Sequence, residues 1–180
     1  MELLEVMLER RSVREYNGEE ISDDALRSIL EAGLLSPSSR NLCPVELITV
    51  KDKDALRNLS RSKTAGADML KSASCAVVVI GDSKKSDVWV EDCSLSMIYM
   101  QLRATELGVA NCWIQCRNRV SQQIGDNENN LSSDEFVKQF LDIPGNYSVL
   151  AILSLGMTDN APNPHTTDKA DFMKVHNEKF

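Results

Sequence analysis

The chain has 180 residues, of which 42% are hydrophobic, and its 20 basic and 27 acidic residues give a net charge of -7. This length suits one α/β or α+β domain with a real core, and the acidic balance argues against nucleic acid as a partner. Residues 1–10 mix leucines with glutamates, unlike a secretory signal, and no apolar run reaches the roughly 20 residues that cross a bilayer. We therefore expect one cytoplasmic domain, residues 1–180, that does not bind membranes.

The first half of the chain predicts helices and strands in a mixed order. Residues 1–10 place apolar side chains on one helical face, and a second helix begins at Ser22, the expected N-cap, and stops near residues 36–37. Strands are predicted at residues 45–50 and 75–80, the latter buried on both faces, with short helices at 52–60 and 65–71.

The longest predicted helix covers residues 87–107 and ends at Gly108, which suits the left-handed position after a helix. A strand at residues 111–116, a polar loop at 121–130, a helix at 132–141 and a buried strand at 147–156 follow. Residues 157–180 contain two prolines and few apolar residues, so we expect a C-terminal arm that either extends freely or wraps around a partner.

Several common kinds of site lack their signature. The five cysteines form no C-x-x-C pair, so reduced thiols are expected, and His165 and His176 have no zinc-binding spacing, so no metal site is predicted. No P-loop, Rossmann or nucleophile-elbow motif occurs. Adjacent carboxylates, such as Glu91-Asp92, fall in polar segments and are interpreted as solvated faces rather than acid–base pairs.

Three segments carry groups that suit a ligand. Arg10, Arg11 and Arg14 place three guanidinium groups at a helix end, where a phosphate would satisfy them, the alternative being a solvated basic helix end. Residues 36–41, Ser-Pro-Ser-Ser-Arg-Asn, form either a ligand-binding loop or an ordinary connection. Residues 108–115 lead from a helix end into a strand with Trp113, which is either a ligand contact or a core residue.

Taken in order, these segments resemble the nitroreductase family of FMN-dependent oxidoreductases. Residues 10–16, R-R-S-V-R-E-Y, resemble the family pattern R-R-S-x-R-x-[FY], and residues 36–44 resemble its [AS]-P-S-x-x-N-x-Q-P loop. Residues 107–114, L-G-V-A-N-C-W-I, are similar to L-G-[LV]-[GA]-x-C-W-[IL], residues 141–144 to L-x-[IL]-P, and residues 151–156 to the final strand. The resemblance covers nearly the whole chain.

The resemblance implies an α+β fold with a central mixed sheet flanked by helices, in a short single-domain form. It implies a homodimer formed through the long central helix, with the arm, residues 157–180, swapped onto the partner subunit. Tightly bound FMN would lie between the subunits, and NAD(P)H would be the transient electron donor. Electrons would pass through flavin N5 to a planar organic acceptor, such as a nitroaromatic compound or a quinone, by a ping-pong mechanism.

The resemblance also implies which residues bind the cofactor, and it nominates no catalytic side chain. Arg10, Arg11 and Ser12 would bind the FMN phosphate, with Arg14 at either the phosphate or the flavin pyrimidine edge, and Lys169 an additional phosphate contact. The remaining expected contacts with the flavin are Pro37, Ser38, Ser39, Asn41, Trp113, Ile114 and Gln115.

The sequence departs from the family pattern beside the asparagine loop. The family's Gln-Pro-Trp is here Cys43-Pro44-Val45, which removes an amide and an indole near the flavin. No covering helix is expected between residues 116 and 132, so we expect an open pocket. Two alternatives remain: a flavin-binding or sensing module without turnover, and a thiol-dependent redox enzyme that uses Cys43.

Overall fold

The computed structural model describes residues 2–122 and 131–180. The described helices are α1 (Leu3–Glu9), α2 (Asp23–Leu34), α3 (Lys53–Leu59), α4 (Trp89–Glu106) and α5 (Ser133–Phe140), and the strands are β1 (Val45–Val50), β2 (Cys75–Asp82), β3 (Ala110–Gln115) and β4 (Tyr147–Gly156). The predicted strands and longer helices are confirmed to within two residues at nearly every end. The α+β fold class is therefore confirmed. The polar loop expected at 121–130 lies mostly outside the described residues, as does most of the segment in which we expected no covering helix.

The sheet has the strand order β1-β2-β4-β3, and each hydrogen-bonded pair is antiparallel. The expectation of a mixed sheet is therefore wrong for the described strands. The reason lies in the path of the chain: α4 carries it back along the sheet, so that β3 runs in the same direction as β2. β4 is inserted between these two strands, which separates the only parallel pair that the crossover could have formed.

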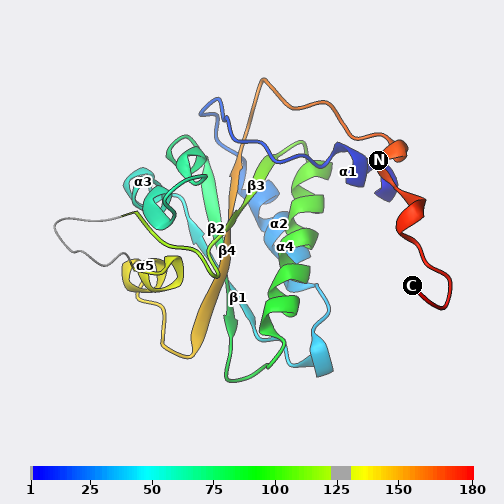
Figure 1. Cartoon of the computed structure of the whole chain (residues 1–180). Coiled ribbons are helices and arrows are strands. Elements are labelled where there is room, and N and C mark those ends of the chain that lie inside the picture. The colour runs from blue at the N-terminus through cyan, green and yellow to red at the C-terminus, as the bar shows by residue number, and fades with distance from the viewer. Residues whose placement is uncertain (1, 123–130) are drawn as a thin grey trace.

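Helices cover both faces of the sheet (Figure 1). On one face, α2 and α4 pack over a core that includes Ile29, Met97 and Leu153. On the other face, α3 and α5 cover a second core that includes Leu56, Val137 and Ile114. Every residue of β2 from Cys75 to Gly81 is buried, as its apolar sequence predicts, because both of its faces meet a helical layer.

Local chemistry explains where the elements begin and end. The Ser22 side chain accepts the Ala25 N–H at the start of α2, so the predicted N-cap is confirmed, and Gly108 after α4 has φ +72°. The helix expected at residues 65–71 is wrong: a short 3-10 turn covers only Asp68–Lys71. Gly66, at φ +81°, interrupts the segment because this conformation cannot continue a helix.

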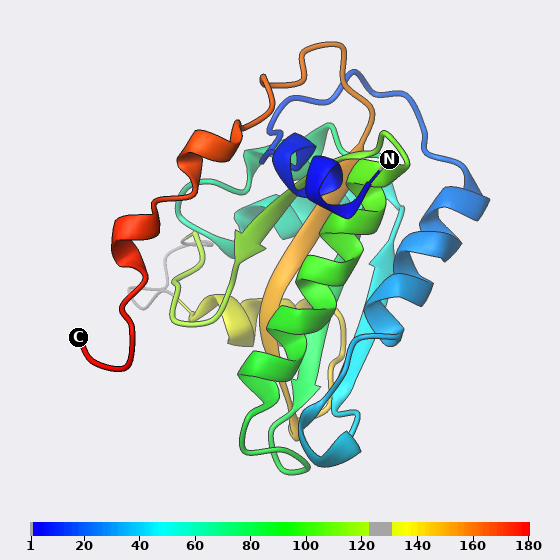
Figure 2. The same cartoon turned by 90° about the vertical axis from the view of Figure 1, so that its right-hand side faces the viewer.

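The N-terminal segment and the arm meet at one end of the molecule. Figure 2 shows α1 beside the C-terminal end of α4, and the arm running past α1 before it leaves the body of the domain. The His165 N–H donates to the carbonyl of Leu8, 2.9 Å away, and the Arg11 side chain donates to the carbonyl of Asn163. The arm contains only short 3-10 turns, at Thr167–Lys169 and Phe172–Lys174. Its exchange onto a partner subunit stays a prediction.

Candidate functional site

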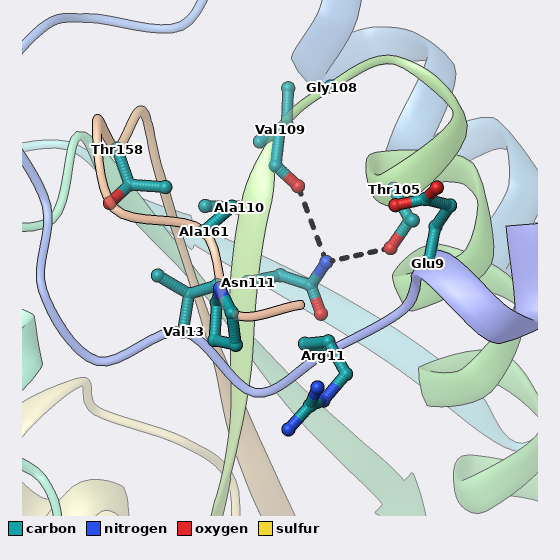
Figure 3. A pocket seen from close by; sticks show the side chains of 11 residues that line it. Glu9, Arg11, Val13, Thr105, Gly108, Val109, Ala110, Asn111, Thr158 and Ala161 are labelled. Atoms are coloured by element: carbon teal, nitrogen blue, oxygen red, sulfur yellow. Dashed lines mark hydrogen bonds between the residues drawn. The ribbon is translucent and has the colours of Figure 1, made fainter. Parts of the chain in front are cut away.

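The arginine segment is fixed against the start of β3. The Val13 N–H donates to the carbonyl of Asn111, 2.9 Å away, and Ser12 forms a parallel bridge with the same residue. Asn111 is itself anchored: its amide donates to Thr105 Oγ1 and to the Val109 carbonyl, both 3.3 Å away, beside a cavity of about 370 Å³ (Figure 3). Residues 10–14 therefore have a defined position at the C-terminal end of α4.

Cations from two distant segments meet at this position. Arg10 and Lys169 line the same cavity of about 570 Å³, between α1 and the arm, and His165 lies there too. The Lys169 Nζ atom is 2.7 Å from Nε2 of His165. Burial and the charges of Lys169, Arg11 and Arg10 together lower the pKa of His165. Sequence reasoning did not nominate His165, because its position in a polar arm gave no signal.

None of Arg10, Arg11, Arg14 and Lys169 forms an ion pair with a carboxylate within residues 2–122 and 131–180. A group of cations that lacks a compensating carboxylate is suited to a multiply charged anion, because such an anion removes their mutual repulsion. Arg14 is exposed. Burial raises the pKa of the Cys112 thiol, and the positive charges of Arg14, Lys63 and Arg10 oppose this rise. Lys63 is a second cation that sequence reasoning missed.

The serine loop lies at the other end of α4. Here the Ser39 N–H donates to Asp92 Oδ1, 2.8 Å away, and Arg40 pairs with Asp87, while Asp92 belongs to the first turn of α4. At about 1.5 Å per residue, the 18 residues of α4 span about 27 Å, with the serine loop at its first turn and the arginine segment at its other end. Figures 1 and 2 both place the loop and α1 at opposite ends of the helix.

The strand residues divide between the two faces of β3. Trp113 and Gln115 are partly exposed on the face that α4 covers, and the Trp113 indole N–H donates to Gln115 Oε1, 2.8 Å away. Ile114 has 1% of its side chain exposed and points into the opposite core. The Ile114 side chain therefore belongs to the core, and only the backbone of this residue lies at the edge of the sheet. β3 is an edge strand of this sheet, so its outer backbone groups beyond the Asn111 bridge can bind a ligand.

One interpretation of the carboxylates is wrong. Glu91 is exposed, as expected of a solvated face, but Asp92 beside it has only 2% of its surface exposed. The Ser36–Asn41 loop folds over the start of α4 and covers Asp92. No local sequence pattern predicts this arrangement. Four cysteines are buried, Cys43 is exposed, and all five are free thiols.

Among the described residues, no group of three or more His, Cys, Asp or Glu side chains could hold a metal ion. No helix of residues 2–122 and 131–180 is both long and apolar enough to span a bilayer.

The fold and the site define a class of protein: an α+β domain with a cationic pocket at one end of its longest helix and a serine-rich loop at the other. Known proteins identify the family. The chain matches the nitroreductase family over residues 7–65 and 59–157, and it belongs to that family.

Two of the matches with individual proteins extend over nearly the whole chain. A curated relative from Archaeoglobus fulgidus, provisionally named NADH dehydrogenase/NAD(P)H nitroreductase, is 33% identical over 99% of both chains. The structure of an FMN-dependent nitroreductase from Clostridium difficile R20291 is 40% identical, with a TM-score of 0.91 over 98% of this chain and 99% of that one. An FMN reductase [NAD(P)H] of Bacillus subtilis is 29% identical over 51% of this chain and 36% of its own length.

Proposed function

We propose that this chain is an FMN-dependent oxidoreductase that passes electrons from NAD(P)H to a planar organic acceptor, with each FMN bound between two copies of the chain. The observation that carries the proposal is the pair of cations Arg10 and Lys169, which line one cavity with His165 and form no ion pair with a carboxylate among the described residues. FMN is proposed as the cofactor because it appears in the names of the Clostridium difficile and Bacillus subtilis relatives.

The cationic pocket fits the phosphate of FMN. Arg10 and Lys169 line one cavity from two different segments, so they can bind oxygens of the same phosphate. Ser12, two residues after Arg10, is held in place by its bridge to Asn111 and carries a hydroxyl that can donate to the same anion. Arg11 is the least available of the group, because its guanidinium already donates to the carbonyl of Asn163. We therefore assign Arg10, Ser12 and Lys169 to the phosphate.

The remaining contacts call for a second copy of the chain. Pro37, Ser38, Ser39 and Asn41 lie at the opposite end of α4 from the phosphate pocket of the same chain, so one FMN would have to span most of a helix about 27 Å long to reach both. In a two-fold dimer with the two α4 helices antiparallel, the loop of one copy approaches the pocket of the other. The outer face of α4 supports this arrangement, because Leu95 and Tyr99 remain 39% and 41% exposed there. The homodimer is therefore part of the proposal.

The edge of β3 suits the flavin ring. Trp113 and Gln115 offer an aromatic face and a polar tip, and Ile114 offers backbone groups. Arg14 is exposed near the same strand, where a cation stabilises negative charge on the pyrimidine edge. FMN, when bound, supplies the two-electron chemistry at N5, with donor and acceptor using the same place in turn. The chain's own contribution is to bind, orient and polarise, which is why we assign no acid or base.

The first test is the visible spectrum of the purified protein and the identity of any chromophore released on denaturation. We expect an oxidised-flavin spectrum, released FMN, and steady NADH or NADPH consumption with a quinone or nitroarene. Bound FMN without NAD(P)H turnover would favour the flavin-binding or sensing module. A protein that does not bind added FMN would contradict the proposal.

The phosphate pocket has a direct test in Arg10→Ala. Loss of a charge-assisted hydrogen bond costs about 1.5–3 kcal/mol, so the dissociation constant of FMN should rise roughly 10- to 100-fold. Arg57→Ala is the matched control, because it removes an exposed guanidinium on α3 that pairs with Asp54. Equal FMN affinity in the two variants would argue against the assigned pocket.

A further inference from the structure

The first turn of α4 contains a buried carboxylate that the proposed function does not use. Asp92 is 2% exposed and forms no ion pair within the described residues. It accepts two hydrogen bonds: from the Ser39 N–H at 2.8 Å and from the Ser86 hydroxyl at 3.1 Å. Burying a charge is costly unless its bonding is satisfied, and the N-terminal dipole of α4 offsets part of that cost. The bond to Ser39 therefore connects the serine loop to the rigid body of the domain.

The loop needs such a connection because its backbone is strained. Arg40, Asn41 and Cys43 have φ angles of 52°, 56° and 46°, a left-handed conformation that costs energy for residues other than glycine. Such a backbone persists only when its surroundings hold it in place.

The other contacts of the loop are exposed. The Cys43 N–H donates to Ser38 Oγ, 2.9 Å away, and Lys85 Nζ donates to the Cys43 carbonyl, 3.1 Å away. Arg40 pairs with Asp87 across side chains that are 61% and 76% exposed, and exposed ion pairs contribute little. The bond from Ser39 to Asp92 is partly shielded from water, and the buried bond from Ser86 fixes the carboxylate that accepts it, so we expect this contact to hold the loop most firmly.

We propose that Asp92 is a positioning residue: it fixes the Ser39 amide and thereby holds the Ser38–Asn41 loop in the conformation that meets the flavin. This inference rests on the proposed function and adds a residue that touches neither cofactor nor substrate. The carboxylate acts at the loop end of α4 and leaves the phosphate pocket, at the other end, unchanged. Loss of the Asp92 carboxylate should therefore weaken binding of the flavin ring and leave binding of the phosphate unchanged.

The test compares Asp92→Ala with Asp92→Asn. The alanine variant has no acceptor for the Ser39 N–H, whereas asparagine keeps one acceptor oxygen and can donate its amide to the Ser86 hydroxyl. We expect the dissociation constant of FMN to rise roughly tenfold in Asp92→Ala, because part of the binding energy must then order the loop, and to stay close to wild type in Asp92→Asn. Asp54→Ala, which removes an exposed carboxylate on α3, is the matched control.

Two readouts separate positioning from general damage to the fold. Riboflavin lacks the phosphate. Asp92→Ala should therefore raise the dissociation constants of riboflavin and FMN by the same factor, while Arg10→Ala should raise that of FMN alone. The visible circular dichroism of the bound flavin should change in Asp92→Ala and recover in Asp92→Asn. Ser86→Ala, which removes one of the two bonds to the carboxylate, should shift both readouts in the same direction even if Asp92→Ala fails to fold.

The outcomes are distinct. A wild-type protein that binds no FMN overturns the proposed function and this inference with it. A wild-type protein that binds FMN, with Asp92→Ala and Ser86→Ala matching it in affinity and visible circular dichroism, overturns the inference alone.

Discussion

His165 is the residue whose ionisation should report on the phosphate pocket. Burial, Lys169 and two arginines lower its pKa below the ordinary value of 6.5, so the folded protein binds fewer protons than the unfolded chain near that pH. Stability therefore falls as the pH drops through 6.5 toward the folded pKa, and the contribution is fully present above 6.5. An anion in the pocket reverses the effect, because it favours the protonated ring.

We predict that the His165 resonance titrates below pH 6.5 in proton NMR and that adding inorganic phosphate raises this pKa. His165→Gln assigns the resonance, and His176, which lies on the arm outside this pocket, is the internal comparison. A His165 pKa that phosphate does not move would show that the anion binds elsewhere.

At the scale of elements, the junction between β4 and the N-terminal segment depends on one small residue. A Cβ atom on Gly156 would lie 2.7 Å from Cδ1 and 2.8 Å from Cγ of the Tyr16 ring. The ring cannot move away easily, because Tyr16 is 9% exposed and its hydroxyl is 2.7 Å from Ser154 Oγ. We predict that Gly156→Ala lowers the free energy of unfolding by about 1–3 kcal/mol, as measured in urea. Gly145→Ala, whose Cβ meets no atom within 4 Å, should stay near wild type, and equal losses in both would refute the argument.

The elements were largely predictable because their signals are local. The Ser22 cap, the Gly108 terminus and the apolar run of β2 each need only neighbouring residues to be interpreted. The direction of strand pairing was not predictable in this way. It depends on β4 entering between β2 and β3, a pairing between segments 65 to 80 residues apart in the sequence, as Asp82 opposite Tyr147 and Cys75 opposite Leu155 show.

The candidate site was likewise predictable only in part. The arginine segment and the serine loop were nominated from their residues and their resemblance to the family, and the structure gives each a fixed position. Asp92 was misinterpreted, because the loop that buries it lies about 50 residues earlier in the chain. Ile114 was nominated as part of a segment, and only the alternation of side chains along β3 shows that its own side chain faces the core.

At the scale of the whole molecule, the proposed FMN site needs two copies of the chain, because its two parts lie at opposite ends of α4. Tyr99 lies near the middle of α4, where a two-fold axis between antiparallel helices would pass, so a charge there would meet its own copy. We predict that Tyr99→Glu shifts the protein to a monomer in light scattering and that this monomer retains no FMN. Phe140→Glu is the matched control, because Phe140 is 37% exposed on α5, across the sheet from α4, and this variant should stay a dimer with its flavin.

The combination of oligomeric state and flavin content decides between the two arrangements of the site. If two copies build each site, the monomer loses the serine loop of its partner and keeps only the phosphate pocket, whose cations alone hold FMN weakly. A Tyr99→Glu monomer that kept FMN at wild-type affinity would mean that one chain supplies every contact, which the length of α4 argues against. Wild-type behaviour in both measurements would instead place the interface on another face of the domain.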